Sequence, residues 1–144
     1  MTQPVALLID DEPDILELLS ITLLRMGLDY TTAENTSQAK SLIDKKNFDL
    51  CLTDMKLPDG SGMEILQYIQ QKQPNTPVAV LTAHGNMETA IEAMKLGAFD
   101  FISKPVDLTS LRALITSALK VKKVAPSAEK TQDASGDRQF IGNK

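Results

Sequence analysis

Near the start of the chain an apolar run ends in two carboxylates, Val5-Ala6-Leu7-Leu8-Ile9-Asp10-Asp11. A second run ends in the same way, Leu50-Cys51-Leu52-Thr53-Asp54, and a third, Phe101-Ile102-Ser103, is followed by Lys104. A carboxylate at the end of a buried strand is unfavourable unless it meets a compensating partner. Because parallel strands end along one edge of a sheet, where open α/β folds keep their sites, we expect three aspartates and a lysine to converge on one pocket.

Short apolar runs alternate with amphipathic stretches along the chain as far as residue 122. The runs mostly lack polar alternation, which is typical of strands that are buried on both faces. The second run is the most polar, and this favours an edge position for it. The predicted strands are Val5–Ile9, Tyr30–Ala33, Leu50–Thr53, Val78–Thr82 and Phe99–Ser103.

Helices are predicted between and after these strands, each with apolar residues spaced three and four apart. The first is expected from Pro13 to Met26, because proline suits a first turn and Gly27 suits the position after a helix. Thr36 or Ser37 is expected to cap the second, and the fifth is expected to begin near Asp107. The inner faces predicted for the second to fifth helices are Ala39, Leu42 and Ile43; Ile65, Leu66 and Ile69; Met87, Ile91 and Met94; and Leu108, Leu111, Ile115 and Ala118.

Five repeats of strand and helix predict an α/β protein, a flavodoxin-like doubly wound (βα)5 fold with a five-stranded parallel sheet. Right-handed crossovers then place helices on both faces. Two strand orders are common in such sheets, 3-2-1-4-5 and 2-1-3-4-5. We favour 2-1-3-4-5, because it makes Asp10, Asp11 and Asp54 neighbours and moves the polar second strand to the edge.

The composition narrows the class of protein. The chain has 144 residues, of which 42% are hydrophobic and 24% are charged, which suits one domain with a tail. No apolar run approaches the roughly 18 residues of a membrane span, and the N-terminus lacks the layout of a signal peptide. The chain has a lone cysteine, Cys51, which we expect to be a small buried residue. The lone cysteine and the lack of a membrane span or signal peptide favour a cytoplasmic protein without membrane contact. The net charge of −4 argues against binding of nucleic acid by this segment itself, and one His and one Cys exclude a His/Cys zinc site.

The predicted domain covers residues 1–122. Residues 123–139 have the composition of a flexible linker. Apolar residues return at Phe140-Ile141-Gly142, just before the sequence stops. Composition leaves two interpretations open for residues 140–144, a frayed tail or the start of a further domain.

Carboxylates that lie within a few ångströms of one another repel, so that either one is protonated or a divalent cation binds among them. Oxygen ligands favour Mg²⁺, with Mn²⁺ as the alternative. We expect Asp11 and Asp54 to be direct ligands, the backbone carbonyl of Lys56 to add a third, and Asp10 to act through water. Glu12 is expected to start the first helix rather than to bind the cation.

An aspartate can act as a nucleophile toward phosphorus and form an aspartyl phosphate. Asp54 is the central acid, between the cation and Lys104, so we predict that a phosphoryl group is transferred onto Asp54 while Lys104 stabilises its oxygens. Thr82, at the end of the fourth strand, offers a hydroxyl at the same edge. A haloacid-dehalogenase-like phosphatase is disfavoured, because it needs a second catalytic aspartate where this chain has Lys56.

Four motifs stand in order along the chain, Leu8-Ile9-Asp10-Asp11-Glu12, Asp54-Met55-Lys56-Leu57-Pro58-Asp59-Gly60-Ser61-Gly62, Leu81-Thr82-Ala83 and Lys104-Pro105. With these motifs the chain resembles, over residues 5–120, the receiver domain of two-component response regulators. This resemblance implies that Asp54 takes a phosphoryl group from a sensor histidine kinase, and that Asp10, Asp11 and the Lys56 carbonyl hold Mg²⁺. It also implies a phosphoacceptor domain rather than an enzyme, limited to self-phosphorylation from a donor and slow autodephosphorylation.

The same resemblance assigns a signalling role to residues beside the acidic cluster. Thr82 and Phe101 would be the switch residues, although many relatives have tyrosine where this chain has Phe101. The Lys104–Pro105 peptide is expected to be cis. Further apolar residues on the first helix would be either core or a docking surface for the kinase: Leu18, Ile21 and Leu24.

Two segments, 81–85 and 93–101, resemble a narrower group, the receivers of nitrogen-regulator-type activators that work with sigma-54. In that group an AAA+ ATPase follows the linker, and Phe140-Ile141-Gly142 fits its start. The resemblance implies a homodimer or higher oligomer through the receiver, and contact with sigma-54 RNA polymerase and DNA through downstream domains. The alternative is a stand-alone receiver that signals by protein docking only and ends near residue 122.

Overall fold

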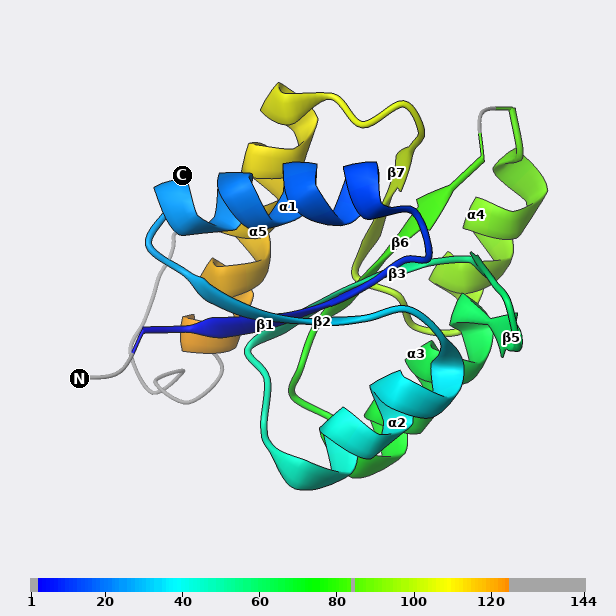
Figure 1. Cartoon of the computed structure of the whole chain (residues 1–144), viewed down its shortest axis with the longest axis horizontal. Coiled ribbons are helices and arrows are strands. Elements are labelled where there is room, and N and C mark those ends of the chain that lie inside the picture. The colour runs from blue at the N-terminus through cyan, green and yellow to red at the C-terminus, as the bar shows by residue number, and fades with distance from the viewer. Residues whose placement is uncertain (1–2, 84, 125–144) are drawn as a thin grey trace, which may run out of the picture.

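The structure is a computed structural model that describes residues 3–83 and 85–124, with side chains through residue 120. Within these residues a five-stranded sheet has the order β2-β1-β3-β6-β7, and every neighbouring pair is parallel (Figure 1). This is the predicted order 2-1-3-4-5, because β6 and β7 are the fourth and fifth strands of the sheet. The flavodoxin-like fold is therefore confirmed, with β2 at the edge. The strands are β1 (Val5–Ile9), β2 (Asp29–Ala33), β3 (Leu50–Asp54), β6 (Val78–Thr82) and β7 (Asp100–Ser103).

Helices cover both faces of the sheet. One core cluster joins the sheet to α1 and α5, and the other joins it to α2, α3 and α4 (Figure 1). Burial on both faces explains why the central strands are apolar along their whole length. The described helices are α1 (Pro13–Arg25), α2 (Thr36–Lys45), α3 (Gly62–Lys72), α4 (Met87–Lys95) and α5 (Leu108–Val124).

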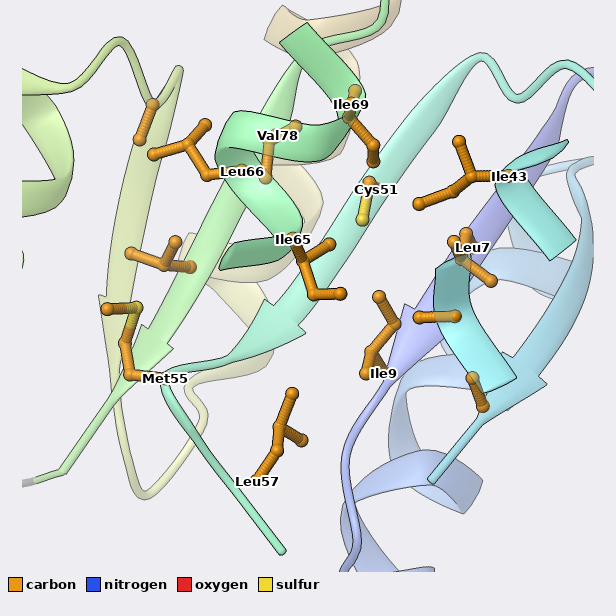
Figure 2. Packing of buried hydrophobic residues seen from close by; sticks show 14 of the residues in the cluster. Leu7, Ile9, Ile43, Cys51, Met55, Leu57, Ile65, Leu66, Ile69 and Val78 are labelled. Atoms are coloured by element: carbon orange, nitrogen blue, oxygen red, sulfur yellow. The ribbon is translucent and has the colours of Figure 1, made fainter. Parts of the chain in front are cut away.

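The cluster under α2 and α3 is drawn in Figure 2, where Ile65 and Ile69 of α3 lie over Cys51 of β3. The predicted burial of Cys51 is confirmed, since its side chain is 0% exposed. Burial raises the pKa of the Cys51 thiol, which keeps it protonated and unreactive at neutral pH.

The cap of α2 is not the one predicted. Asn35, rather than Thr36 or Ser37, is the N-cap, and its side-chain oxygen accepts a hydrogen bond from the Gln38 amide at 2.8 Å. Thr36 is already the first helical residue, and its side chain is buried. The start of α5 agrees with expectation, because Asp107 accepts hydrogen bonds from the amide and hydroxyl of Ser110.

The inner face predicted for α4 is wrong. Met87, Ile91 and Met94 are 50%, 50% and 41% exposed, and the buried residues of the helix are Ala90 and Ala93. The two alanines let the helix backbone approach the sheet closely, and the larger side chains lie on the neighbouring stripe of the helix. Leu108, predicted as an inner residue of α5, is also exposed.

A short antiparallel hairpin after β3 was not predicted. Its strands are β4 (Lys56–Leu57) and β5 (Gly60–Ser61), joined through Pro58 and Asp59. Pro, Asp and Gly in succession are typical turn residues, so a signal for the turn was present in the sequence. Leu57 anchors the hairpin, because its side chain is buried in the cluster that contains Ile9 (Figure 2).

α5 continues to Val124, two residues past the predicted end of the domain. The rest of the expected linker and the expected start of an AAA+ domain at residues 140–144 lie outside the described residues. None of the helices formed by residues 3–83 and 85–124 is long and apolar enough to cross a membrane.

Candidate functional site

Four carboxylates meet where β1 and β3 end. Asp10 directly follows β1 and Asp54 is the last residue of β3; the two strands pair in register, with Ile9 opposite Thr53. One ligand oxygen each from Asp10, Asp11, Glu12 and Asp54 lies within 4.8 Å of the others. Asp10 and Asp54 are buried, while Asp11 and Glu12 are exposed. The predicted convergence of the three aspartates is therefore present in the structure.

Lys104 supplies the positive charge of this cluster. Its amide donates to the Thr82 carbonyl at 2.8 Å, which continues the pairing of β7 with β6. Its Nζ lies 3.1 Å from Asp10 Oδ2, 3.0 Å from Glu12 Oε2 and 3.2 Å from Asp54 Oδ2. Burial acts to lower the pKa of Lys104, but Glu12, Asp10 and Asp54 outweigh it and raise that pKa, so the side chain stays charged. The Lys104–Pro105 peptide is cis, as expected.

Glu12 has two places in the structure. Its carbonyl accepts hydrogen bonds from the amides of Ile15 and Leu16, so it starts α1 as predicted. Its carboxylate also belongs to the acidic cluster and pairs with Lys104, and this second contact is not among the sequence-based predictions. The available signal was its position directly after Asp11 in the same strand-end motif.

Asp10 is a buried acid with a raised pKa. Burial raises the pKa of Asp10 from 3.8 to about 6. The Glu12 amide, which donates to Asp10 Oδ1 at 2.9 Å, lowers this pKa, the charge of Asp54 raises it, and Lys104 lowers it. A second positive charge at the cluster would relieve the repulsion between the carboxylates.

Lys56 begins the β4–β5 hairpin two residues after Asp54. Its side chain is exposed, and its backbone lies close to the cluster, since the amide nitrogen is 3.5 Å from Asp54 Oδ1. The base of the hairpin closes through the Gly62 amide, which donates to the Met55 carbonyl at 3.0 Å. A Cβ at Gly62 would overlap the carbonyl oxygen of Asp54, so glycine is required there.

The two expected switch residues lie on neighbouring strands. Thr82 ends β6 and is 1% exposed, and among the described residues its hydroxyl has no hydrogen-bond partner. Buried hydroxyls are normally paired, so this one is available for a group that enters the site. Phe101 lies on β7 opposite Val80, is half-buried, and packs against the core cluster under α2, α3 and α4.

The arrangement fits a hard divalent cation. The ligand atoms that the cluster offers are carboxylate oxygens, which Mg²⁺ and Mn²⁺ prefer. The site opens into a groove of about 730 Å³ whose lining includes Asp11, Asp54, Lys56 and Lys104. A small charged ligand can therefore reach Asp54 from solvent.

Comparison with known proteins agrees with this geometry. The response regulator receiver domain family matches residues 6–116. The response regulator protein PilR of Pseudomonas aeruginosa is 54% identical over 142 residues, which are 99% of this chain and 31% of PilR. The DNA-binding transcriptional regulator NtrC of Escherichia coli is 33% identical over 119 residues, which are 83% of this chain and 25% of NtrC. The chain thus spans about a third or less of the length of these curated relatives.

A solved structure also matches. The beryllofluoride-activated NtrC4 receiver domain dimer superposes with a TM-score of 0.77 and 31% identity, covering 82% of this chain and 98% of that one. The matches to NtrC and NtrC4 support the narrower resemblance to nitrogen-regulator-type receivers that was inferred from the sequence.

Proposed function

Because the chain belongs to the response regulator receiver domain family, we propose that Asp54 accepts a phosphoryl group from a sensor histidine kinase. One observation carries the proposal: the buried Asp54 carboxylate lines an open groove, with Lys104 Nζ 3.2 Å away and oxygens of Asp10 and Asp11 within 4.8 Å. Asp10 and Glu12 also pair with Lys104, but Asp10 is fully buried and Glu12 is exposed at the start of α1, whereas Asp54 is a strand-end carboxylate that lines the groove. We regard the domain as a phosphoacceptor rather than an enzyme.

In the proposed step, a carboxylate oxygen of Asp54 attacks phosphorus and an O–P bond forms. The bond from phosphorus to the kinase histidine nitrogen breaks, and the electron pair returns to that imidazole. Lys104 stabilises the charge on the phosphoryl oxygens, because its ammonium group is already held beside Asp54. Asp10, Asp11, Asp54 and the Lys56 carbonyl would hold Mg²⁺ or Mn²⁺, which when bound neutralises phosphoryl charge.

Thr82 is the residue that would report the phosphoryl group. Its buried hydroxyl, which lacks a partner among the described residues, would donate a hydrogen bond to a phosphoryl oxygen. Phe101 would then fill the space that Thr82 leaves, and β6, α4 and β7 would shift together as a two-state element. The gain of a hydrogen bond to a charged acceptor supplies the driving force.

The exposed apolar side chains of α4 suggest how the signal leaves the domain. Met87, Ile91 and Met94 form an exposed apolar stripe along α4, and such exposed apolar groups mark interaction surfaces. We propose that this face contacts a second copy of the domain, as the dimer of the NtrC4 receiver suggests. On α1, Ile21 and Leu24 are 42% and 54% exposed, which favours the kinase-docking interpretation over the core one for these two residues.

The output is proposed from the resemblance to nitrogen-regulator-type activators. A linker at residues 123–139 would lead to an AAA+ domain that begins at Phe140-Ile141-Gly142 and acts on sigma-54 RNA polymerase and DNA. A stand-alone receiver that signals by docking is the second candidate. The sequence of the gene beyond Lys144 separates the two, since only the first requires an ATPase domain there.

The acceptor assignment is tested by incubating the chain with Mg²⁺ and acetyl phosphate, followed by intact-protein mass spectrometry. We expect the mass of one added phosphoryl group on wild type and none on Asp54→Asn, because the amide is a poor nucleophile. Omitting Mg²⁺ should reduce the labelled fraction. Equal labelling of wild type and Asp54→Asn, or an unlabelled wild type, would contradict the proposal.

A further inference from the structure

We propose that Asp59 is a positioning residue for the cation site: from the tip of the β4–β5 hairpin it binds the first turn of α2, and this contact sets the place of the Lys56 carbonyl. The inference deepens the proposed function and rests on it, because it concerns the cation that the acidic cluster would hold. Asp59 itself does not belong to the acidic cluster.

The contact is made by both oxygens of one carboxylate. The Thr36 amide donates to Asp59 Oδ1 at 2.8 Å, and the Ser37 amide donates to Oδ2 at 3.2 Å. Two hydrogen bonds donated to one carboxylate fix its orientation as well as its distance. The negative charge also suits the N-terminus of a helix. These hydrogen bonds lower the pKa of Asp59, and the one from the Thr36 amide contributes most. The carboxylate is therefore charged at neutral pH.

The first turn of α2 shares its amides between two acceptor residues. Asn35 takes the Gln38 amide on its side-chain oxygen, and its carbonyl accepts the first regular helical hydrogen bond, from the Ala39 amide. Helices leave their first amides without internal partners, and here local and distant groups together satisfy them. α2 therefore has a cap of its own, and the bonds to Asp59 serve to connect the helix to a segment 22 residues further along the chain.

The hairpin needs such a connection. Its strands are two residues each, with Lys56 opposite Ser61 and Leu57 opposite Gly60, and a hairpin this short is not stable alone. At its base it is held by the buried Leu57 and by the Gly62–Met55 hydrogen bond. At its tip Pro58 and Asp59 are exposed, and Asp59 connects the tip to α2 through its two hydrogen bonds.

Lys56 lies between Met55 and Leu57, which hold the base of the hairpin, and the chain continues from there to Asp59 at the tip. Mg²⁺ demands close to octahedral geometry, so a carbonyl ligand that moves by a fraction of an ångström binds it less well. Releasing the tip would let the Lys56 carbonyl move while leaving the carboxylates in place. Loss of a group that orients a metal ligand typically weakens metal binding by about 10-fold or more.

The test compares Asp59→Ala with Asn35→Ala in the full chain. Both variants remove side-chain acceptors from the first turn of α2, but only Asp59 belongs to the hairpin. We expect Asp59→Ala to weaken Mg²⁺ binding about 10-fold in isothermal titration calorimetry. Asn35→Ala should destabilise the domain while it keeps the wild-type Mg²⁺ affinity, and Asp59→Asn, which keeps one oxygen acceptor, should fall between wild type and Asp59→Ala.

The amide signals of Lys56 and Leu57 in metal-free NMR spectra provide a second readout, expected to shift in Asp59→Ala and not in Asn35→Ala. Wild-type Mg²⁺ affinity in Asp59→Ala, or an equal loss in Asn35→Ala, overturns the positioning role. If wild type binds no Mg²⁺, the proposed cation site is wrong. The positioning role is then tested by the metal-free NMR spectra alone. Unchanged amide signals of Lys56 and Leu57 in Asp59→Ala overturn it.

Discussion

Asp10 is a residue whose ionised form is unfavourable in the folded domain. Its carboxylate is fully buried beside Asp54, and its pKa is raised to about 6, above the 3.8 of an unperturbed aspartate. The folded state therefore binds the proton more tightly than the unfolded state between these two values. This group lowers the free energy of unfolding as the pH rises through that interval, by roughly 2–3 kcal/mol once Asp10 is ionised.

We accordingly predict that Asp10→Asn makes the metal-free domain more stable at about pH 7.5, and that the advantage shrinks towards about pH 4. Urea unfolding of both proteins without divalent cations measures the difference directly. Mg²⁺ should reverse the order at high pH, because it stabilises the wild type more than the variant. A variant that is less stable than wild type at both pH values would show that the loss of one Lys104 partner dominates.

The helix α4 is attached to the rest of the domain through small side chains and one side-chain hydrogen bond at its C-terminal end. It packs on the sheet through Ala90 and Ala93, and its C-terminal end is held by Gln70 of α3, whose side-chain amide donates to the Leu96 carbonyl at 2.8 Å. Gly97 follows with φ 107°, and a Cβ there would overlap the Gln70 amide. This hydrogen bond thus restrains the element that the proposed switch moves.

Gln70→Ala is expected to increase local opening of α4, because a hydrogen bond of this kind contributes about 1 kcal/mol. Hydrogen exchange of the amides of α4 should become roughly fivefold faster, while the exchange of β1 and β3 stays unchanged. Gln71→Ala, an exposed neighbour on the same helix, is the matched control and should exchange like wild type. Equal acceleration in both variants, or none in Gln70→Ala, would mean that Gln70 does not restrain α4.

The molecule as a whole depends on two cores on opposite sides of one sheet. Leu66 of α3 is 0% exposed in one of them, whereas Leu24 of α1 is 54% exposed. The same substitution at the two positions separates burial from helix propensity. We expect Leu66→Ala to lower the free energy of unfolding by about 2–5 kcal/mol, and Leu24→Ala by less than about 1 kcal/mol.

Urea denaturation with a common slope for the three proteins measures these losses. The free energy of unfolding of a native domain is about 5–15 kcal/mol in total, so Leu66→Ala should remove a large part of it. Similar losses at Leu66 and Leu24 would show that the buried cluster under α3 does not dominate the stability of the fold.

Most of the architecture could be predicted from local patterns. Apolar runs of strand length alternate with amphipathic segments, and this leaves a doubly wound sheet as the natural arrangement. The polarity of the second strand and the carboxylates after the first and third then select one strand order. The same reasoning brings Asp10, Asp11, Asp54 and Lys104 together, because parallel strands end at one edge.

What could not be predicted concerns contacts between residues that are far apart in the sequence. Periodicity shows that Met87, Ile91 and Met94 share a side of α4, but not that the sheet contacts the neighbouring alanine stripe. Nor does it reveal that Glu12 pairs with Lys104, 92 residues away.

The amino-acid sequence by itself therefore determined the kind of fold, the strand order and the identity of the aspartates and the lysine at the site, because these follow from local polarity and from the geometry of any parallel sheet. Only the tertiary structure decided which face of α4 is buried, that Asp59 binds α2, and that the Thr82 hydroxyl has no partner among the described residues. Those features depend on distances of a few ångströms between separate elements, and such distances are set only when the whole domain packs.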